Sequence, residues 1–123
     1  MSKCISVLGS TGSIGRQTLQ VARELGLKVA ALTAGKQIDL LEQQARQFRP
    51  CLVAVFEENA ARELRERLKD LPIQVMSGME GLLAAAELAE SDTVVTAVMG
   101  SVGLEPTLAA IRRKKRIALA NKE

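Results

Sequence analysis

Histidine, tyrosine and tryptophan are absent from this 123-residue sequence, and each absence excludes a kind of site. Without histidine, the chain cannot build a Ser-His-Asp triad or a histidine-containing zinc site. Without tyrosine and tryptophan, it lacks the usual platform for stacking single-stranded bases. Two cysteines are too few for a disulfide scaffold or a cysteine-only metal site. Because only two phenylalanines are present, aliphatic side chains must fill the core.

Long hydrophobic runs are also absent, because charges or glycines interrupt every apolar stretch. None approaches the ~20 apolar residues that a membrane span requires. The N-terminal residues 1–5 run directly into a strand-like segment, without the apolar region and cleavage site of a signal peptide. We therefore expect a cytoplasmic protein with no membrane partner.

The net charge of +3 does not indicate a nucleic-acid partner. Acidic and basic residues are mixed along residues 57–70, as on an ordinary solvated helix face. The one basic run, residues 112–116, falls where a helix is predicted to end, and cations there complement the helix dipole.

Strand-like and helix-like segments alternate along the chain. The predicted strands are residues 3–8, 28–33, 52–56, 73–76, 93–98 and 116–120. The predicted helices are residues 14–25, 38–48, 59–69, 80–89 and 104–113. Asn59 is a candidate N-cap for the third helix, and Pro106 lies in the first turn of the last helix.

Apolar strands that are each followed by a helix indicate a parallel sheet covered on both faces. Right-handed crossovers then predict one α/β domain over residues 1–123, a doubly wound, Rossmann-like parallel sheet of about six strands. In the usual strand order 3-2-1-4-5-6, the second strand separates Cys4 from Cys51, beyond the reach of a disulfide. We expect both cysteines to be buried free thiols.

The strongest local signal is the glycine-rich segment 9–15 (GSTGSIG), between the first strand and the first helix. Gly9, Gly12 and Gly15 suit a tight turn, close approach of a pyrophosphate, and close packing of the helix on the strand. The free N–H groups of the helix N-terminus attract phosphates. The motif is not a P-loop, because no Gly-Lys-Ser/Thr follows, so it predicts dinucleotide binding.

The end of the second strand indicates which dinucleotide is bound. NAD-binding domains usually place a carboxylate there to hold the ribose 2′-hydroxyl, but residues 31–37 (ALTAGKQ) contain none. A carboxylate would repel a 2′-phosphate, whereas Lys36 attracts one, and Gly35 lets the backbone approach the ribose. The sequence therefore favours NADP(H), although a solvated loop lysine would look the same.

Two further segments follow strands at the edge where ligands bind in such sheets. Residues 99–103 (MGSVG) follow the fifth strand and are expected to face the dinucleotide, although a plain strand-to-helix turn would look the same. Asn121, Lys122 and Glu123 follow the sixth strand with no closing helix, so we expect a truncation rather than a natural chain end.

Taken together, these motifs resemble one family, the 1-deoxy-D-xylulose 5-phosphate reductoisomerases. The resemblance runs in order through residues 8–19, 34–36, 48–50, 100–110 and 119–123. It covers the whole chain and is more specific than the glycine turn alone. It implies the N-terminal, NADPH-binding domain of an enzyme of this family.

The resemblance implies the reaction of the full-length enzyme. That enzyme rearranges 1-deoxy-D-xylulose 5-phosphate and reduces it with NADPH to 2-C-methyl-D-erythritol 4-phosphate, in non-mevalonate isoprenoid biosynthesis. It implies a divalent metal (Mg²⁺, Mn²⁺ or Co²⁺), a phosphorylated sugar substrate and a homodimer. The metal ligands, the catalytic residues and the substrate-phosphate site lie beyond the matched segment. We therefore expect this chain to hold no catalytic or metal-ligating residue and to bind cofactor without turnover.

The resemblance also implies roles for particular residues. The pyrophosphate side of NADPH is expected to contact Thr11, Gly12, Ser13 and Ile14. The adenosine 2′-phosphate ribose is expected to contact Gly35, Lys36 and Gln37, the last of which is often asparagine in the family. Asn121 and Glu123 are expected near the nicotinamide half, and Lys122 at the substrate.

Two other functions stay open from the sequence alone. The chain could belong to another NADP-dependent dehydrogenase, such as a short-chain or semialdehyde dehydrogenase. A short-chain enzyme requires a Tyr-x-x-x-Lys pair, and this chain has no tyrosine, although truncation could hide it. The chain could also be a module that senses NADP(H) without chemistry.

Overall fold

The computed structural model describes residues 3–97 and 103–119, and strands and helices alternate through both ranges. The strands are β1 (Cys4–Leu8), β2 (Lys28–Ala34), β3 (Leu52–Val55), β4 (Gln74–Ser77), β5 (Thr93–Thr96) and β6 (Arg116–Leu119). The helices are α1 (Ser13–Leu25), α2 (Ile38–Phe48), α3 (Glu58–Arg67), α4 (Gly78–Glu87) and α5 (Leu104–Arg112). Each lies within a few residues of its predicted position.

The six strands form one sheet in the order β4-β3-β2-β1-β5-β6, and every neighbouring pair is parallel. The prediction of a doubly wound parallel sheet is confirmed. The order differs from the usual 3-2-1-4-5-6. Four strands, β1 to β4, rather than three are placed side by side before the chain crosses to the other side of β1. Strand β4 pairs with the outer edge of β3, and α4 then returns the chain to the other side of β1.

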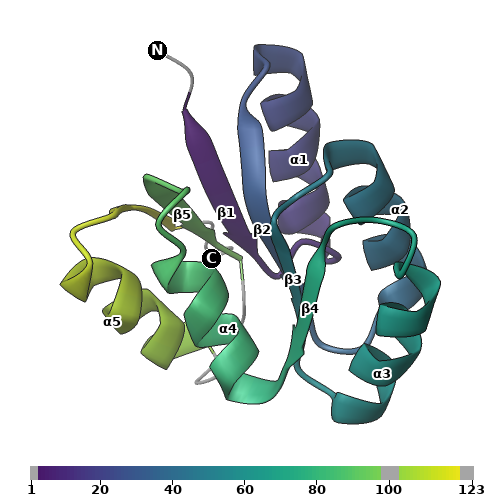
Figure 1. Cartoon of the computed structure of the whole chain (residues 1–123). Helices are drawn as coiled ribbons and strands as arrows, with labels where there is room; N and C mark the ends of the chain where they lie inside the picture. The colour runs from purple at the N-terminus through teal and green to yellow at the C-terminus, as the bar shows by residue number, and fades with distance from the viewer. Residues whose placement is uncertain (1–2, 98–102, 120–123) are drawn as a thin grey trace.

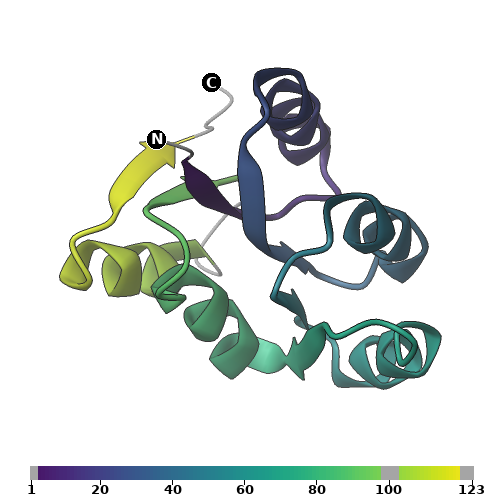
Figure 2. The same ribbon diagram turned by 45° about the horizontal axis from the view of Figure 1, so that its top comes forward.

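Helices cover both faces of the sheet, as predicted. Helices α1, α2 and α3 lie on one face, whereas α4 and α5 lie on the other (Figures 1 and 2). Side chains of successive strand residues point to opposite faces, so each strand contributes to two cores. In β1, Val7 packs in the core under α1–α3, and Leu8 packs in the core under α4 and α5.

Two of the three predicted helix-end features are confirmed. Pro106 is buried in the first turn of α5, and the basic run 112–116 begins where this helix ends. The prediction that Asn59 caps α3 is wrong. The helix begins at Glu58, Glu57 occupies the N-cap position, and no side chain makes a capping hydrogen bond there.

Both cysteines are free, as predicted, and β2 lies between the strands that carry them. The expectation that both are buried is wrong, because Cys4 is half-buried and Cys51 is exposed. Cys51 lies immediately before β3, at the amino end of that strand, and its side chain is not covered by the helices. Among residues 3–97 and 103–119, no helix is long and apolar enough to cross a membrane.

Candidate dinucleotide-binding site

The glycine turn leaves β1 at the carboxyl edge of the sheet and passes directly into α1. Gly9 has a φ of +84°, in the left-handed region that glycine adopts readily. A Cβ atom on Gly15 would lie 2.1 Å from the carbonyl oxygen of Gly9 and 2.6 Å from the Cα of Ser10. Only glycine allows α1 to pack this closely against the turn, as the motif predicted.

The N-terminus of α1 is open to solvent. Gly12 is the N-cap residue, no side chain caps the helix, and no acidic residue lies in its first turn. A Cβ on Gly12 would have one neighbour within 4 Å, the Gly9 carbonyl oxygen at 4.0 Å. The first-turn N–H groups and the positive end of the helix dipole are therefore available to an anion.

A buried network of hydrogen bonds connects the glycine turn to β2 and α2. The Gly9 N–H donates to Oγ1 of Thr33 (2.9 Å), and the Ser10 N–H donates to the Thr33 carbonyl oxygen (2.9 Å). The Ser10 hydroxyl donates to Oε1 of Gln44 (2.7 Å), while Nε2 of Gln44 donates to the Ser10 carbonyl oxygen (2.9 Å). The relative exposures of Ser10, Thr33 and Gln44 are 0%, 1% and 6%.

Thr33 and Gln44 were not identified from the sequence as part of the site. Gln44 lies next to Ala45 and one helical turn from Leu41, both fully buried positions of α2. A glutamine among the apolar positions of an amphipathic helix is the signal that points to it, because buried amides require partners.

The segment predicted to bind the 2′-phosphate lies beside the turn. Gly35, Lys36 and Gln37 are exposed and connect the carboxyl end of β2 to α2. Gln37 is the N-cap residue of α2, and its carbonyl oxygen accepts the Leu41 N–H at 3.2 Å. A Cβ on Gly35 would meet no atom within 4 Å, so the backbone is accessible there.

A hollow of about 370 Å³ lies beside Lys36 and is rich in charge. Lys36 forms no ion pair with any residue in the described parts of the chain. The other cation of this hollow is Arg67, whose Nη1 lies 2.6 Å from Oδ1 of Asp39 and 3.4 Å from Oε1 of Glu42. Arg67 also pairs with Glu63. Lys36 is therefore the cation left available to a phosphate.

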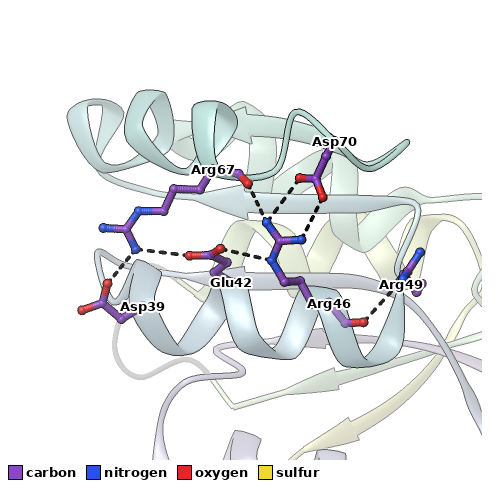
Figure 3. A network of polar contacts seen from close by, with 6 residues as sticks. All are labelled: Asp39, Glu42, Arg46, Arg49, Arg67 and Asp70. Atoms are coloured by element: carbon purple, nitrogen blue, oxygen red, sulfur yellow. Dashed lines mark hydrogen bonds and ion pairs between the residues drawn. The ribbon is translucent and has the colours of Figure 1, made fainter.

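The Arg67 pairs belong to a network that joins α2 to α3 (Figure 3). Its second centre is Arg46, which contacts Glu42, both carboxylate oxygens of Asp70 and the carbonyl oxygen of Arg67. Hydrogen bonds from Arg46 hold the pKa of Asp70 below its ordinary value. Hydrogen bonds to Asp39 and Glu63 raise the pKa of Arg67, which stays charged.

The structure brings the two predicted halves of the adenosine-diphosphate site together at one edge of the sheet. Strands β1 and β2 pair side by side, and Thr33 joins their carboxyl ends. Thr11 and Ile14 are half-buried, whereas Gly12 and Ser13 are exposed. Four predicted contacts at the start of α1 and three in the Lys36 segment therefore lie on neighbouring parts of this edge: Thr11, Gly12, Ser13, Ile14, Gly35, Lys36 and Gln37.

The predicted nicotinamide and substrate contacts, Asn121, Glu123 and Lys122, lie outside the described residues. So do residues 99–102 of the second glycine-bearing turn. The strands that precede these segments are described. Strand β6 pairs in parallel with β5, and β5 with β1, so all three strands end at the same edge of the sheet.

A larger hollow, about 460 Å³, lies elsewhere. It is mostly apolar and opens between α1 and strands β1, β5 and β6, and Ile14, Val21 and Val95 are among the residues that line it. Of the predicted cofactor contacts within residues 3–97 and 103–119, only Ile14 borders it. Since its walls carry few polar groups to orient phosphates, we do not assign the dinucleotide to this hollow.

No cluster of three or more histidine, cysteine, aspartate or glutamate residues suited to a metal ion occurs in residues 3–97 and 103–119. What these residues offer is an open helix N-terminus, a glycine-rich turn and, in Lys36, a lysine without an ion pair. This arrangement suits binding a phosphorylated dinucleotide.

Comparison with known proteins supports the resemblance seen in the sequence. The family described as 1-deoxy-D-xylulose 5-phosphate reductoisomerase matches residues 5–123. The enzyme of that name from Ruminiclostridium cellulolyticum is 54% identical over 123 residues, covering 100% of this chain and 32% of the relative. The chain thus spans about a third of the length of the curated relatives it matches.

Solved structures of the same enzyme have the same fold. The 1-deoxy-D-xylulose 5-phosphate reductoisomerase from Zymomonas mobilis in complex with NADPH superposes with a TM-score of 0.92 at 34% identity, covering 98% of this chain and 32% of that one. A DOX-P reductoisomerase in complex with magnesium superposes with a TM-score of 0.93 at 36% identity, covering 98% and 31%.

Proposed function

The chain belongs to the 1-deoxy-D-xylulose 5-phosphate reductoisomerase family, and from that membership we propose that residues 1–123 form the NADPH-binding domain of such an enzyme. The full-length enzyme converts 1-deoxy-D-xylulose 5-phosphate into 2-C-methyl-D-erythritol 4-phosphate, a step of non-mevalonate isoprenoid biosynthesis. The family match over residues 5–123 favours this function over a short-chain dehydrogenase or a redox sensor.

One observation carries the cofactor assignment. The uncapped N-terminus of α1 and the unpaired Lys36 lie on adjacent loops at the same edge of the sheet. The helix N-terminus suits the pyrophosphate. Lys36, with no carboxylate at the end of β2, suits the 2′-phosphate that distinguishes NADPH from NADH. NADPH is also the cofactor present in the related structure from Zymomonas mobilis.

Each predicted contact has a specific role in this proposal. The backbone N–H groups of Thr11–Ile14 bind the pyrophosphate, and the hydroxyls of Thr11 and Ser13 add donors. Residues Gly35–Gln37 bind the 2′-phosphate ribose. Asn121 and Glu123 contact the nicotinamide half, and Lys122 contacts the substrate.

The chemistry is divided between this domain and the rest of the enzyme. NADPH supplies a hydride that, with one proton, reduces the carbonyl of the rearranged sugar phosphate. This domain holds and orients the cofactor, while the divalent metal (Mg²⁺, Mn²⁺ or Co²⁺) and the catalytic residues belong to the part of the relatives that this chain does not span. Residues 1–123 alone therefore bind cofactor without turnover. We further propose that the full-length enzyme is a cytoplasmic homodimer.

The first experiment is a titration of the chain with NADPH and with NADH, followed by cofactor fluorescence. It compares the unmodified chain with Lys36→Glu and with Lys28→Glu. Lys28 is the matched control, since it is exposed at the opposite end of the same strand. We expect Lys36→Glu to weaken NADPH binding by about tenfold or more, because it replaces a charge-assisted contact with repulsion. NADH binding should change little.

Lys28→Glu should leave both affinities within about twofold of the unmodified chain, which corresponds to less than 0.5 kcal/mol. Equal losses for NADPH and NADH in Lys36→Glu would contradict the 2′-phosphate assignment. An unmodified chain that binds neither cofactor, in a fold verified by circular dichroism, would contradict the cofactor assignment itself.

A further inference from the structure

Gln44 is a buried side chain of α2 that makes two hydrogen bonds to one residue of the glycine turn. Its Oε1 accepts the Ser10 hydroxyl at 2.7 Å, and its Nε2 donates to the Ser10 carbonyl oxygen at 2.9 Å. The two residues are far apart in sequence, and both lie in the buried part of the domain. The contact therefore links the turn before α1 directly to α2.

This pair of bonds requires an amide. The Ser10 carbonyl can only accept, and it faces the Gln44 NH₂ group, whereas the hydroxyl donates to the amide oxygen. An ionised carboxylate at position 44 would place an acceptor against that carbonyl. An apolar side chain would leave the buried Ser10 groups without these partners, at a cost of roughly 1–3 kcal/mol.

Ser10 is held at each of its polar groups. Its N–H donates to the Thr33 carbonyl oxygen, its hydroxyl contacts Gln44 and, at 3.3 Å, the Thr33 carbonyl oxygen, and its own carbonyl accepts from Gln44. Thr11 follows it directly and begins the segment with free N–H groups. The orientation of Ser10 therefore sets the direction in which that segment leaves the sheet.

Helix α2 is a firm support for this contact. Glu42 of α2 pairs with Arg67 of α3, and Arg46 pairs with Asp70, which follows α3 (Figure 3). At about 100° per residue, positions 42 and 46 project from the side of α2 opposite to position 44. The N-terminus of the same helix follows Lys36. One helix thus carries the 2′-phosphate segment at its start and contacts the pyrophosphate turn through Gln44.

We propose that Gln44 is a positioning residue for the cofactor: through Ser10 it sets the pyrophosphate turn at a fixed distance from the 2′-phosphate segment. This inference rests on the proposed function, since it assumes that a dinucleotide phosphate spans both loops. Gln44 itself contacts no part of the cofactor. Its effect is confined to ligands that must reach the turn and Lys36 at once.

The test uses two ligands that differ in this respect. NADPH carries both a pyrophosphate and a 2′-phosphate, whereas adenosine 2′-monophosphate carries the 2′-phosphate alone. Dissociation constants are measured by NMR titration for the unmodified chain, Gln44→Met and Gln43→Met. Methionine resembles glutamine in length but cannot donate from its end. Gln43 is the matched control, because it is exposed on the same helix.

Gln44→Met should weaken NADPH binding about tenfold, the equivalent of one to two buried hydrogen bonds, and adenosine 2′-monophosphate binding less than about twofold. Gln43→Met should change neither. Equal weakening of both ligands by Gln44→Met would indicate a general structural role and overturn the proposal, as would unchanged NADPH binding. Ser10→Ala removes one of the two hydrogen bonds, and it should also weaken NADPH binding more than adenosine 2′-monophosphate binding, by a smaller factor than Gln44→Met. This variant replaces Gln44→Met in the test if Gln44→Met fails to fold.

A measurement without ligand separates this proposal from the proposed function. Amide hydrogen exchange of Gly9, Ser10 and Arg16, whose N–H groups are hydrogen-bonded, reports how firmly the turn is held. Gln44→Met should accelerate this exchange about tenfold, and Gln43→Met should leave it unchanged. If neither ligand binds the unmodified chain, the cofactor assignment fails, and unchanged exchange in Gln44→Met would independently overturn the positioning role.

Discussion

The carbonyl oxygen of Gly9 occupies the space where a side chain on Gly15 would begin, 2.1 Å from the position of its Cβ. A Cβ this close to backbone cannot be accommodated unless α1 moves away from the turn. We expect Gly15→Ala to lower the free energy of unfolding by at least about 3 kcal/mol and to abolish cofactor binding. Urea denaturation and a fluorescence titration measure the two effects.

Gly12→Ala is the control for this change, since a Cβ on Gly12 has no close neighbour and its φ of −78° suits any residue. We expect the free energy of unfolding to stay within about 0.5 kcal/mol of the unmodified value. NADPH binding should still weaken, because the methyl group occupies the space in front of the helix N-terminus. Unimpaired NADPH binding in Gly12→Ala would argue against a pyrophosphate at this position.

Two buried serines should respond oppositely to loss of their hydroxyl. The Oγ of Ser6 is buried and has no hydrogen-bond partner among residues 3–97 and 103–119, whereas the Oγ of Ser10 donates to Gln44. Ser6→Ala should therefore leave stability unchanged or raise it by up to about 1 kcal/mol, because an unsatisfied polar group is removed. Ser10→Ala should lower stability by roughly 1–2 kcal/mol. Paired urea denaturation curves test both, and a clear loss in Ser6→Ala would reveal a partner for that hydroxyl.

The pKa of Asp70 is held below its ordinary value, chiefly by hydrogen bonds from Arg46. Its contribution to stability is therefore complete above the ordinary pKa of an aspartate and disappears as the pH falls through the lower pKa of the folded state. Carbonyl NMR titration should show the Asp70 pKa rising towards its ordinary value in Arg46→Met. Arg49→Met, which removes a weaker charge effect, should shift it less. An unchanged Asp70 pKa in Arg46→Met would mean that the pair does not persist in solution.

The two thiols should differ in reactivity. Cys51 is exposed, whereas Cys4 is half-buried and its pKa is raised, mainly by that burial. Both limited access and a smaller thiolate fraction slow reaction of Cys4 with a disulfide reagent at neutral pH. Mass spectrometry of the partly labelled protein should find the label first on Cys51, and the two rates should converge in denaturant. Preferential labelling of Cys4 in the folded protein would contradict this arrangement.

The elements and the turn could be predicted because their causes are local. Short apolar runs such as residues 52–55 indicate buried strands, Gly9 follows β1 directly, and Lys36 lies two residues after the end of β2. The strand order could not be predicted, because whether β4 joins β3 or returns beside β1 depends on which edge its neighbours leave open. Gln44 was missed for a similar reason. Its partner lies on another element, so its own segment shows only a polar residue among apolar ones.

The N-cap of α3 could not be predicted from the sequence for a different reason. Asn59 has a good capping side chain, but Glu57 takes the position because its N–H donates to the Gly35 carbonyl oxygen at 3.0 Å. That bond attaches the loop after β3 to the loop after β2. A contact between loops thus outweighs the local preference for asparagine at an N-cap.

The central place of β1 also has a consequence for how the chain folds. On one side β1 pairs with β2, which follows after a single helix, but on the other side Ile5 pairs with Thr93, near the opposite end of the sequence. Contacts between residues so distant along the chain slow folding. During synthesis from the N-terminus, β1 to β4 with α1–α3 can assemble first, and one edge of β1 then stays unpaired until β5 is made. That interval is when an apolar strand edge is open to aggregation, so production of this domain should improve when a chaperone is abundant.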